Sequence, residues 1–280
     1  MMGKVIMSGI VPQLVAPLSV DPVLNNNSWE TISKISQMGL AAQYWAVGDT
    51  KTITINGTVG NTTFSNLSVD AFILGFNHNS SREGANRIHF QIGKTTNGTD
   101  IAFCDSCYSR TGSSKDFRMN LSATNSGGWK ESYGRKTLLG NSGTPNSPPA
   151  NSFMAALPAD LLAVMKSVKK YTNNKGDANN TASAVTATTD YLFLLAEFEI
   201  QGSTLHANGY EQRYQAQYDY YKAGNSKVKY RHDATGTSVH HWCRSAWCNG
   251  SEPFCCVNSN GTANAVDANY SYGLAPGFCV

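Results

Sequence analysis

The residues best suited to chemistry gather in one short span, HHWCRSAWCNGSEPFCCVNSNG, which runs from His240 to Gly261. It holds two histidines, four cysteines, two tryptophans and one arginine. Such a set could bind a metal, exchange disulfides, supply a catalytic nucleophile, or form a rigid frame under a binding surface. The rest of the sequence is needed to distinguish these four possibilities.

Zinc binding would need a second pair of ligands. Cys104 and Cys107 have the two-residue spacing of a zinc knuckle, but the C-terminal cysteines lack that spacing and could complete a site only by meeting the first pair in space. The alternative is a turn with buried thiols, or one disulfide formed outside the cell. We expect no metal and no other cofactor, and Cys104 and Cys107 are the pair to inspect for zinc.

A thiol nucleophile would need an activating environment. Cys243 or Cys248 could pair with a neighbouring histidine or with Asp267. However, no helix N-terminus is expected there to lower a thiol pKa, and the adjacent tryptophan and phenylalanine side chains would raise it. Other catalytic motifs, such as G-x-S-x-G, the P-loop and H-E-x-x-H, are also missing from the sequence. We expect that the protein is not an enzyme, and that Arg244 is a buried anchor for strand-end carbonyls or a carboxylate.

A binding surface fits the residues just downstream. The stretch NSNGTANAVDANYSY (258–272) consists almost entirely of short polar residues and tyrosines, a mixture typical of adaptable binding loops. An ordinary polar hairpin would have the same composition, so the stretch alone leaves both interpretations open.

Composition narrows the possible partners. The chain has 280 residues, of which 41% are hydrophobic and only 15% are charged, and its net charge is +3. This charge is too small for a dedicated nucleic-acid binder, and no apolar run is long enough to span a membrane. The polar surface must therefore come from Asn, Ser, Thr and Gly, as in β-rich, loop-rich proteins.

Several elements can be placed from their patterns. Residues 25–39 predict a helix, with Asn27 or Ser28 as its cap and Gly39 as its end. Alternation predicts strands over 47–57 and 86–93, and a longer apolar run predicts a central strand over 67–79. Helical pieces are expected near 150–156 and 158–162, a strand at 164–172, a surface loop over 173–190 and a core segment at 191–202. The prolines before residue 24 favour an extended arm, although an ordinary first strand would also fit.

The motifs in order resemble a known group. SWETISKISQMG, FILGFNHN, DYLFLLAEFEIQGST and the terminal HHWCRSAW…GLAPGFCV are similar to an uncharacterised domain family of gut Firmicutes and their prophages. The resemblance covers about residues 27–280. It implies one domain over 27–280, preceded by an extended arm over 1–26.

The C-terminal block also resembles the C-type-lectin-like fold of phage variable adhesins and formylglycine-generating enzymes. The usual terminal Gly-Phe-Arg is Gly277-Phe278-Cys279 here, and the cysteine motif of those enzymes does not align. The resemblance implies an α+β fold with short antiparallel strands, a few short helices and long loops. It implies a structural frame of Trp242, Arg244, Ser245, Gly273, Pro276 and Phe278. It implies outward-facing ligand-binding residues, namely Asn258, Asn260, Asn264, Asn269, Tyr270 and Tyr272.

These resemblances lead to an expected function. The protein would be a phage or prophage virion protein, made without a leader in the bacterial cytoplasm. It would dock to other virion proteins through residues 1–24 and bind a bacterial or mucosal glycan or protein. The alternatives are a capsid or tail decoration protein without a ligand, and a thiol or formylglycine-type enzyme. By analogy with phage fibres, a homotrimer is the assembly to test.

Overall fold

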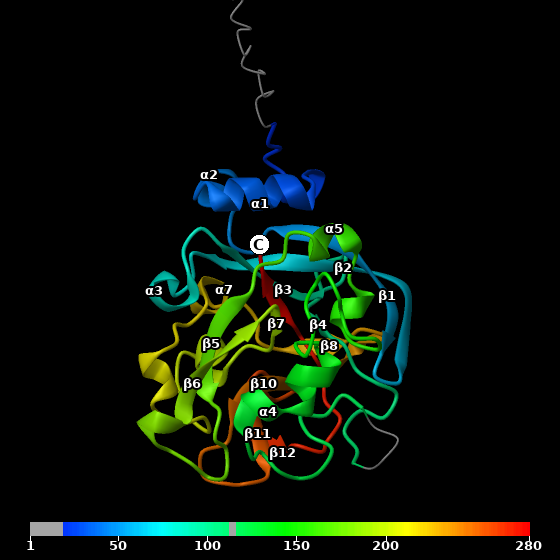
Figure 1. Cartoon of the computed structure of the whole chain (residues 1–280). Coiled ribbons are helices and arrows are strands. Elements are labelled where there is room, and N and C mark those ends of the chain that lie inside the picture. The colour runs from blue at the N-terminus through cyan, green and yellow to red at the C-terminus, as the bar shows by residue number, and fades with distance from the viewer. Residues whose placement is uncertain (1–18, 112–115) are drawn as a thin grey trace, which may run out of the picture.

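The protein is an α+β structure with short helices and mostly antiparallel strands (Figure 1). This computed structural model describes residues 19–111 and 116–280. The predicted α+β class, with few short helices and long loops, is confirmed. The α-helices are α1 (Trp29–Gln37), α2 (Ala41–Tyr44), α3 (Ser80–Glu83), α4 (Gly128–Glu131), α5 (Ala159–Leu162), α6 (Glu197–Gln201) and α7 (Asp219–Lys222).

Single turns of tighter or wider helix supplement these. The 3-10 turns are η1 (Leu24–Asn26), η3 (Met154–Ala156), η4 (Ala182–Ala184) and η5 (Glu211–Arg213), and η2 (Gly134–Leu138) is π-helical. The strands are β1 (Thr50–Val59), β2 (Thr62–Phe76), β3 (Ile88–Lys94), β4 (Ile101–Ala102), β5 (Val168–Asn173), β6 (Val185–Asp190), β7 (Leu192–Phe193), β8 (Lys229–Arg231), β9 (Ala234–Val239), β10 (His241–Ala246), β11 (Pro253–Val257), β12 (Ala263–Asp267) and β13 (Gly277–Cys279).

The largest sheet combines strands from the first hundred residues with the C-terminal strand. Its strand order is β1-β2-β3-β13-β7, so the C-terminal strand lies between β3 and β7. Phe278 on β13 pairs with Phe90 on β3, and the two rings stack 5.2 Å apart. A strand from the last residues of the chain therefore completes a sheet begun by the first hundred.

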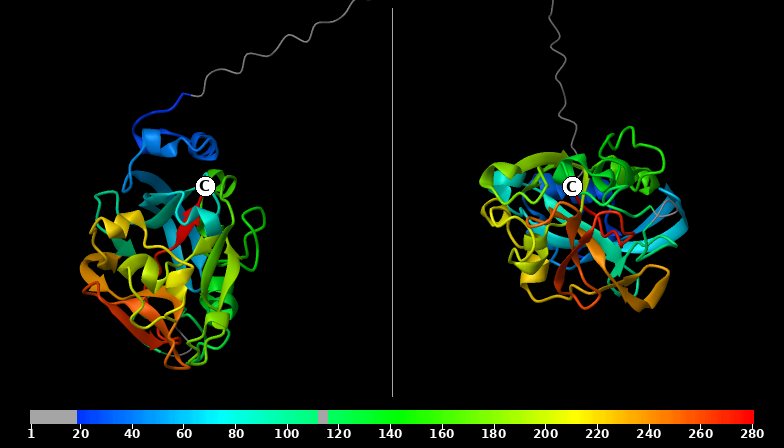
Figure 2. Two further views of the ribbon diagram at one scale, coloured as in Figure 1. Left: turned by 90° about the vertical axis from the view of Figure 1, so that its left-hand side faces the viewer. Right: turned by 90° about the horizontal axis from the view of Figure 1, so that it is seen from below.

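Helix α1 covers one face of this sheet. Ser28 caps it as predicted, because its side chain accepts a hydrogen bond from the Thr31 amide. Trp29 meets Phe90 and Phe278 edge-on at 5.4 and 5.7 Å between ring centroids. The views in Figures 1 and 2 place α1 and α2 as a layer at one end of the molecule.

Three smaller sheets build the rest. Their orders are β10-β11-β12, β4-β8-β9 and β5-β6, with β4 and β8 the one parallel pair among the described strands. The β11–β12 hairpin lies at the end of the molecule opposite α1 and α2 in both side views (Figures 1 and 2). One large hydrophobic cluster runs from Leu24 to Val280, and a small second cluster joins Ala102, Cys104 and Val239.

Two sequence predictions need correction. Residues 173–190 are not all surface loop, because β6 pairs along the whole of β5. The sequence hides β6 because its residues are mostly threonine and alanine, without apolar alternation. The boundary of the arm at residue 26 is also too late: Leu24 is buried in the core, and the indole of Trp45 donates to the carbonyl of Asp21. Most of the predicted arm, residues 1–18, lies outside the described residues.

Candidate functional site

The asparagines predicted to bind a ligand lie on and beside the β11–β12 hairpin. The Asn264 amide donates to Oδ1 of Asn258 at 2.9 Å, and the Asn258 amide donates to Oγ1 of Thr262 at 3.0 Å. Asn260 is exposed at the turn, and Asn269 is half-buried just after β12. These bonds order the amides while leaving them partly open to water, as a preorganised binding surface requires.

The two predicted tyrosines differ in their exposure. Tyr270 is half-buried, with its ring 5.9 Å from that of Tyr272. Tyr272 is only 6% exposed, so it does not face outward as expected. Its ring stacks on His240 at 5.0 Å and lies 5.1 Å from Trp242, because the chain turns inward before β13. Tyr272 therefore supports Tyr270 from below and belongs with the frame.

The structural frame is buried. The Trp242 indole donates to the carbonyl of Phe117 at 3.0 Å, and the Ser245 hydroxyl donates to the Glu211 carboxylate at 2.7 Å. A side chain on Gly273 would come within 2.7 Å of Ala102, so only glycine fits where this loop crosses. Pro276 and Phe278 are buried on the way into and within β13. All six expected frame residues are therefore buried, but Pro276 and Phe278 belong to the large sheet next to β3 and α1, and not to the support of the hairpin.

Arg244 lies at the centre of a buried ion network. Its guanidinium donates to both carboxylate oxygens of Glu199 on α6, with Nη2 2.8 Å from Oε1. Nη1 also donates to the carbonyl of Leu194 at 2.9 Å. The prediction that Arg244 anchors a carboxylate or a strand-end carbonyl is confirmed, because it does both.

Lys170 on β5 extends this network. Its ammonium donates to Glu83 at 2.6 Å, to Glu199 at 3.1 Å and to the hydroxyl of Tyr218 at 2.8 Å. The Tyr218 hydroxyl lies 3.0 Å from Nδ1 of His89, and its ring stacks on His78 at 3.7 Å. A hydroxyl that accepts from lysine can still donate to a neutral histidine, so one chain of bonds joins these groups.

The network is electrically balanced. Burial raises the pKa of Glu199, but the charges of Arg244 and Lys170 outweigh burial and leave this pKa below its usual range. Burial raises the pKa of Glu83, and Lys170 opposes the shift. Burial, reinforced by the charge of Lys170, lowers the pKa of His78 to about 3, so this imidazole is neutral. Two cations therefore face two carboxylates in a site closed to water.

One group in the network has the spacing of metal ligands. Ligand atoms of His78, Glu83 and Glu199 lie within 4.8 Å of one another. The Lys170 ammonium already bonds both carboxylates and neutralises them together with Arg244. A lysine occupies the place that a cation would take, so the cluster is an ion network in its present form.

The predicted zinc pair forms part of a turn. Oδ1 of Asp105 accepts from the Cys107 amide at 2.9 Å, and Oδ2 accepts from the Asp116 amide at 2.8 Å. Within residues 19–111 and 116–280, no third ligand joins Cys104 and Cys107 to form a cluster of three. Asp105 therefore organises this loop, and the described residues here do not amount to a zinc site.

Burial keeps six of the thiols protonated. Six cysteines are buried, namely Cys104, Cys243, Cys248, Cys255, Cys256 and Cys279. Burial raises the pKa of Cys104 and of Cys279 to about 12, and raises those of Cys243 and Cys255 well above the usual value. The thiolate is the reactive form, so the histidines near them do not create an activated pair.

Sequence reasoning missed the residue that holds the base of the hairpin. Asn125 donates to the carbonyls of Trp247, Gly250 and Pro253, at 3.3, 2.7 and 2.8 Å. Its Oδ1 accepts from the Asp177 amide at 2.8 Å. The asparagine lies more than a hundred residues from the loop it fastens, and no local pattern marks it.

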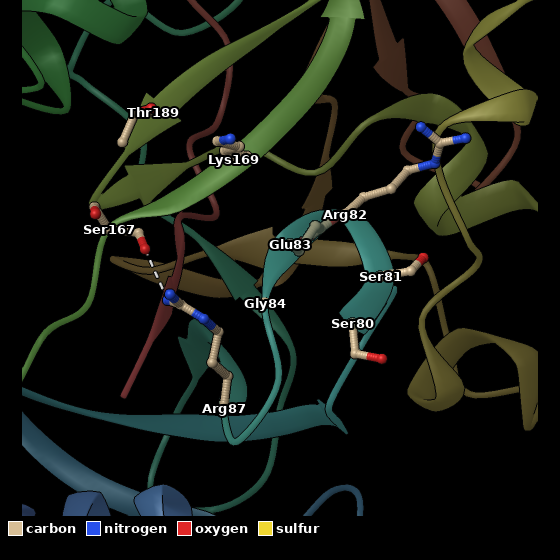
Figure 3. Close-up of a pocket in the computed structure, with 9 residues that line it drawn as sticks. All are labelled: Ser80, Ser81, Arg82, Glu83, Gly84, Arg87, Ser167, Lys169 and Thr189. Carbon is tan, nitrogen blue, oxygen red and sulfur yellow. Dashed lines mark hydrogen bonds between the residues drawn. The ribbon is translucent and has the colours of Figure 1, made fainter.

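Two surface hollows flank the buried network. One, of about 350 Å³, lies between α3 and the β5–β6 pair (Figure 3). The other, of about 360 Å³, lies beside His78, Phe198 and Asp219. Glu83 lines the first and His78 lines the second, so the network forms the wall between them. Neither hollow could be predicted from the sequence, because each is lined by segments that lie far apart in the chain.

Comparison with known families supplies one match. A domain of unknown function, DUF6273, matches residues 113–280. The chain belongs to the DUF6273 family. The expectation of an uncharacterised domain family is confirmed at this level. No curated protein and no solved structure matches the chain.

The DUF6273 segment packs as one unit with the residues before it. Its last strand, β13, pairs with β3, and Lys170 within the segment bonds Glu83 outside it. The described helices of this DUF6273 protein include none long and apolar enough to cross a bilayer.

Proposed function

We propose that this DUF6273 protein is a binding protein of a phage or prophage virion, an adhesin that contacts a bacterial or mucosal glycan or protein. The observation that carries the proposal is the position of the hairpin. The β11–β12 hairpin, which carries the ordered amide of Asn264 bonded to Asn258, lies at the end of the domain opposite α1 (Figure 1). If residues 1–24 dock the protein to another virion protein, the hairpin at the opposite end would stay free to contact a ligand.

The chemistry of the surface suits recognition. Half-exposed asparagines offer donors and acceptors to sugar hydroxyls or peptide groups, and a tyrosine ring offers a face for stacking. The buried frame and Asn125 fix this surface in advance, which lowers the entropic cost of binding. The buried, protonated thiols beneath it favour binding over thiol catalysis. Two parts of this proposal, the C-type-lectin-like fold and the location on a virion, rest on the resemblance of the sequence motifs.

The test is binding of the full-length protein to a glycan array and to host cells, presented at high avidity. Tyr270→Ala and Asn264→Ala should each weaken binding, Tyr270→Ala by about tenfold if it is a central contact. Asn97→Ala is the control, because Asn97 is an exposed loop residue on another strand connection.

Two results would contradict adhesion. One is no binding to any glycan or cell at high avidity, and the other is binding that survives both hairpin substitutions unchanged. Normal infection by virions that lack the protein, with reduced particle stability, would instead support decoration.

A further inference from the structure

The hollow between α3 and the β5–β6 pair is lined by cations and hydroxyl groups. Figure 3 shows Arg87 on one side of the hollow and Lys169 and Thr189 on the strands, while the hydroxyl groups of Ser80 and Ser81 on α3 point away from Arg87 and Lys169. The full lining is Ser80, Ser81, Arg82, Glu83, Gly84, Arg87, Ser167, Lys169 and Thr189. Its volume of about 350 Å³ lies within the range of small-ligand sites.

The side chains that reach the hollow carry positive charge. Lys169 is exposed on β5, opposite Thr189 in the strand pairing. Arg87 uses Nη1 to donate to the Ser167 carbonyl at 2.7 Å, and its Nε is buried without a hydrogen-bond partner among the described residues, which leaves Nη2 as the donor free to face the hollow. An arginine has five donors, so this guanidinium keeps capacity for an anion. Lys166, next to Ser167, is close enough for the charge of Arg87 to add to burial in lowering its pKa.

The acidic residue of the lining does not oppose this charge. Glu83 is buried, and its carboxylate is bonded to Lys170 on the far side of the wall. Asp190, next to Thr189, is buried and bonded to Trp129 and Arg135. The exposed part of the hollow therefore has a net positive charge together with several hydroxyl groups.

The two walls of the hollow are fastened together. The Glu83–Lys170 pair joins α3 to β5, and the Asn79 amide donates to the Tyr214 carbonyl at 2.8 Å. Arg82 extends away from Arg87, with its guanidinium 4.6 Å from the centre of the Tyr214 ring (Figure 3). A site whose walls are tied through a buried ion pair keeps its shape without a ligand.

We infer that this hollow binds a single acidic sugar, with Arg87 and Lys169 on its carboxylate and the hydroxyl of Thr189, opposite Lys169 in the strand pairing, on its ring. Arginine matches a carboxylate with two parallel donors, and hydroxyls match sugar hydroxyls. The volume admits one small ligand, and the net charge of +3 is too low for a nucleic-acid partner. The site lies apart from the β11–β12 hairpin and does not depend on it.

The experiment measures binding of sodium glucuronate and N-acetylneuraminate to the full-length protein by NMR or calorimetry at low salt. Glucose and sodium sulfate are the comparison ligands. Both acidic sugars are expected to bind more tightly than glucose and sulfate, and more weakly as salt is added. Lys169→Ala should weaken their binding by about fivefold, and Arg87→Gln by about tenfold or more.

The matched control is Lys175→Ala, since Lys175 is an equally exposed lysine just beyond the other end of β5. Lys169→Ala removes only an exposed side chain, so it tests the site even if Arg87→Gln fails to fold. Binding no tighter than glucose, sulfate binding as tightly as the acidic sugars, or equal losses in Lys169→Ala and Lys175→Ala would each overturn the inference. Tyr270→Ala should leave this binding unchanged, which separates its failure from that of the hairpin proposal.

Discussion

Arg244 on β10 and Glu199 on α6 form a two-point ion pair at the centre of the protein, where both side chains are fully buried. Lys170 and Glu83 complete the set, so two cations meet two carboxylates away from water. Such a pair contributes little net energy when it is intact, because desolvation offsets attraction. Its energetic importance appears when one partner is removed.

Arg244→Met should therefore destabilise the protein by about 3–5 kcal/mol, because it leaves a buried carboxylate without its main partner. Arg244→Met combined with Glu199→Leu should lose less than the sum of the single changes, because Lys170 and Glu83 remain as a neutral pair. Urea denaturation of the four proteins measures this, with Arg213→Met, an exposed arginine over Tyr210, as control. Additive losses would argue against coupling between the two residues.

Acid should weaken the fold earlier than the carboxylates alone would require. Burial lowers the pKa of His78 to about 3, and those of His89 and His241 well below 6.5. The unfolded chain therefore takes up protons on these histidines below pH 6.5 while the folded chain does not. The contribution of these histidines to stability is therefore complete above that pH, and each should remove up to about 1.4 kcal/mol per pH unit below it.

The His78 contribution can be isolated by His78→Phe, which keeps a ring to stack on Tyr218. Between pH 6 and pH 4, the free energy of unfolding of this variant should fall less steeply than that of the wild type. The difference in slope should approach about 1.4 kcal/mol per pH unit, the value for one proton. The two curves should run parallel above pH 7. Parallel curves across the whole range would show that His78 titrates alike in both states.

The sequence predicted elements whose signals are local. Ser28 and the apolar spacing of Trp29, Ile32 and Ile35 mark α1 within a dozen residues, and the structure confirms it. Alternating threonine and isoleucine similarly marks β1. Strand β6 was not predicted because Val185 is its only buried apolar residue, and the other buried positions, Thr188 and Asp190, are polar, so no apolar alternation marks its pairing with β5.

The candidate site was predictable only in part. A buried Arg244 could be anticipated from its place among aromatic residues, but its partner Glu199 lies 45 residues away and Glu83 much farther. The sequence around a charged residue does not show whether that residue is buried, because its burial depends on partners that only the fold brings together. The inward turn of Tyr272 and the hollow beside Arg87 are also tertiary features, absent from any single stretch.

The state of the cysteines offers a direct test of the alternative that the protein is a thiol enzyme. Burial raises the pKa of the six buried thiols, so at pH 8 each is almost wholly protonated and shielded from reagents. A colorimetric thiol reagent should label at most one cysteine of the folded protein within minutes, the half-buried Cys107. All seven should react in urea, and Cys107→Ser should remove the fast phase. Rapid labelling of Cys243 or Cys248 in the folded protein would contradict the buried, protonated state. It would also return these residues to consideration as nucleophiles, since an activated thiolate must be both ionised and accessible.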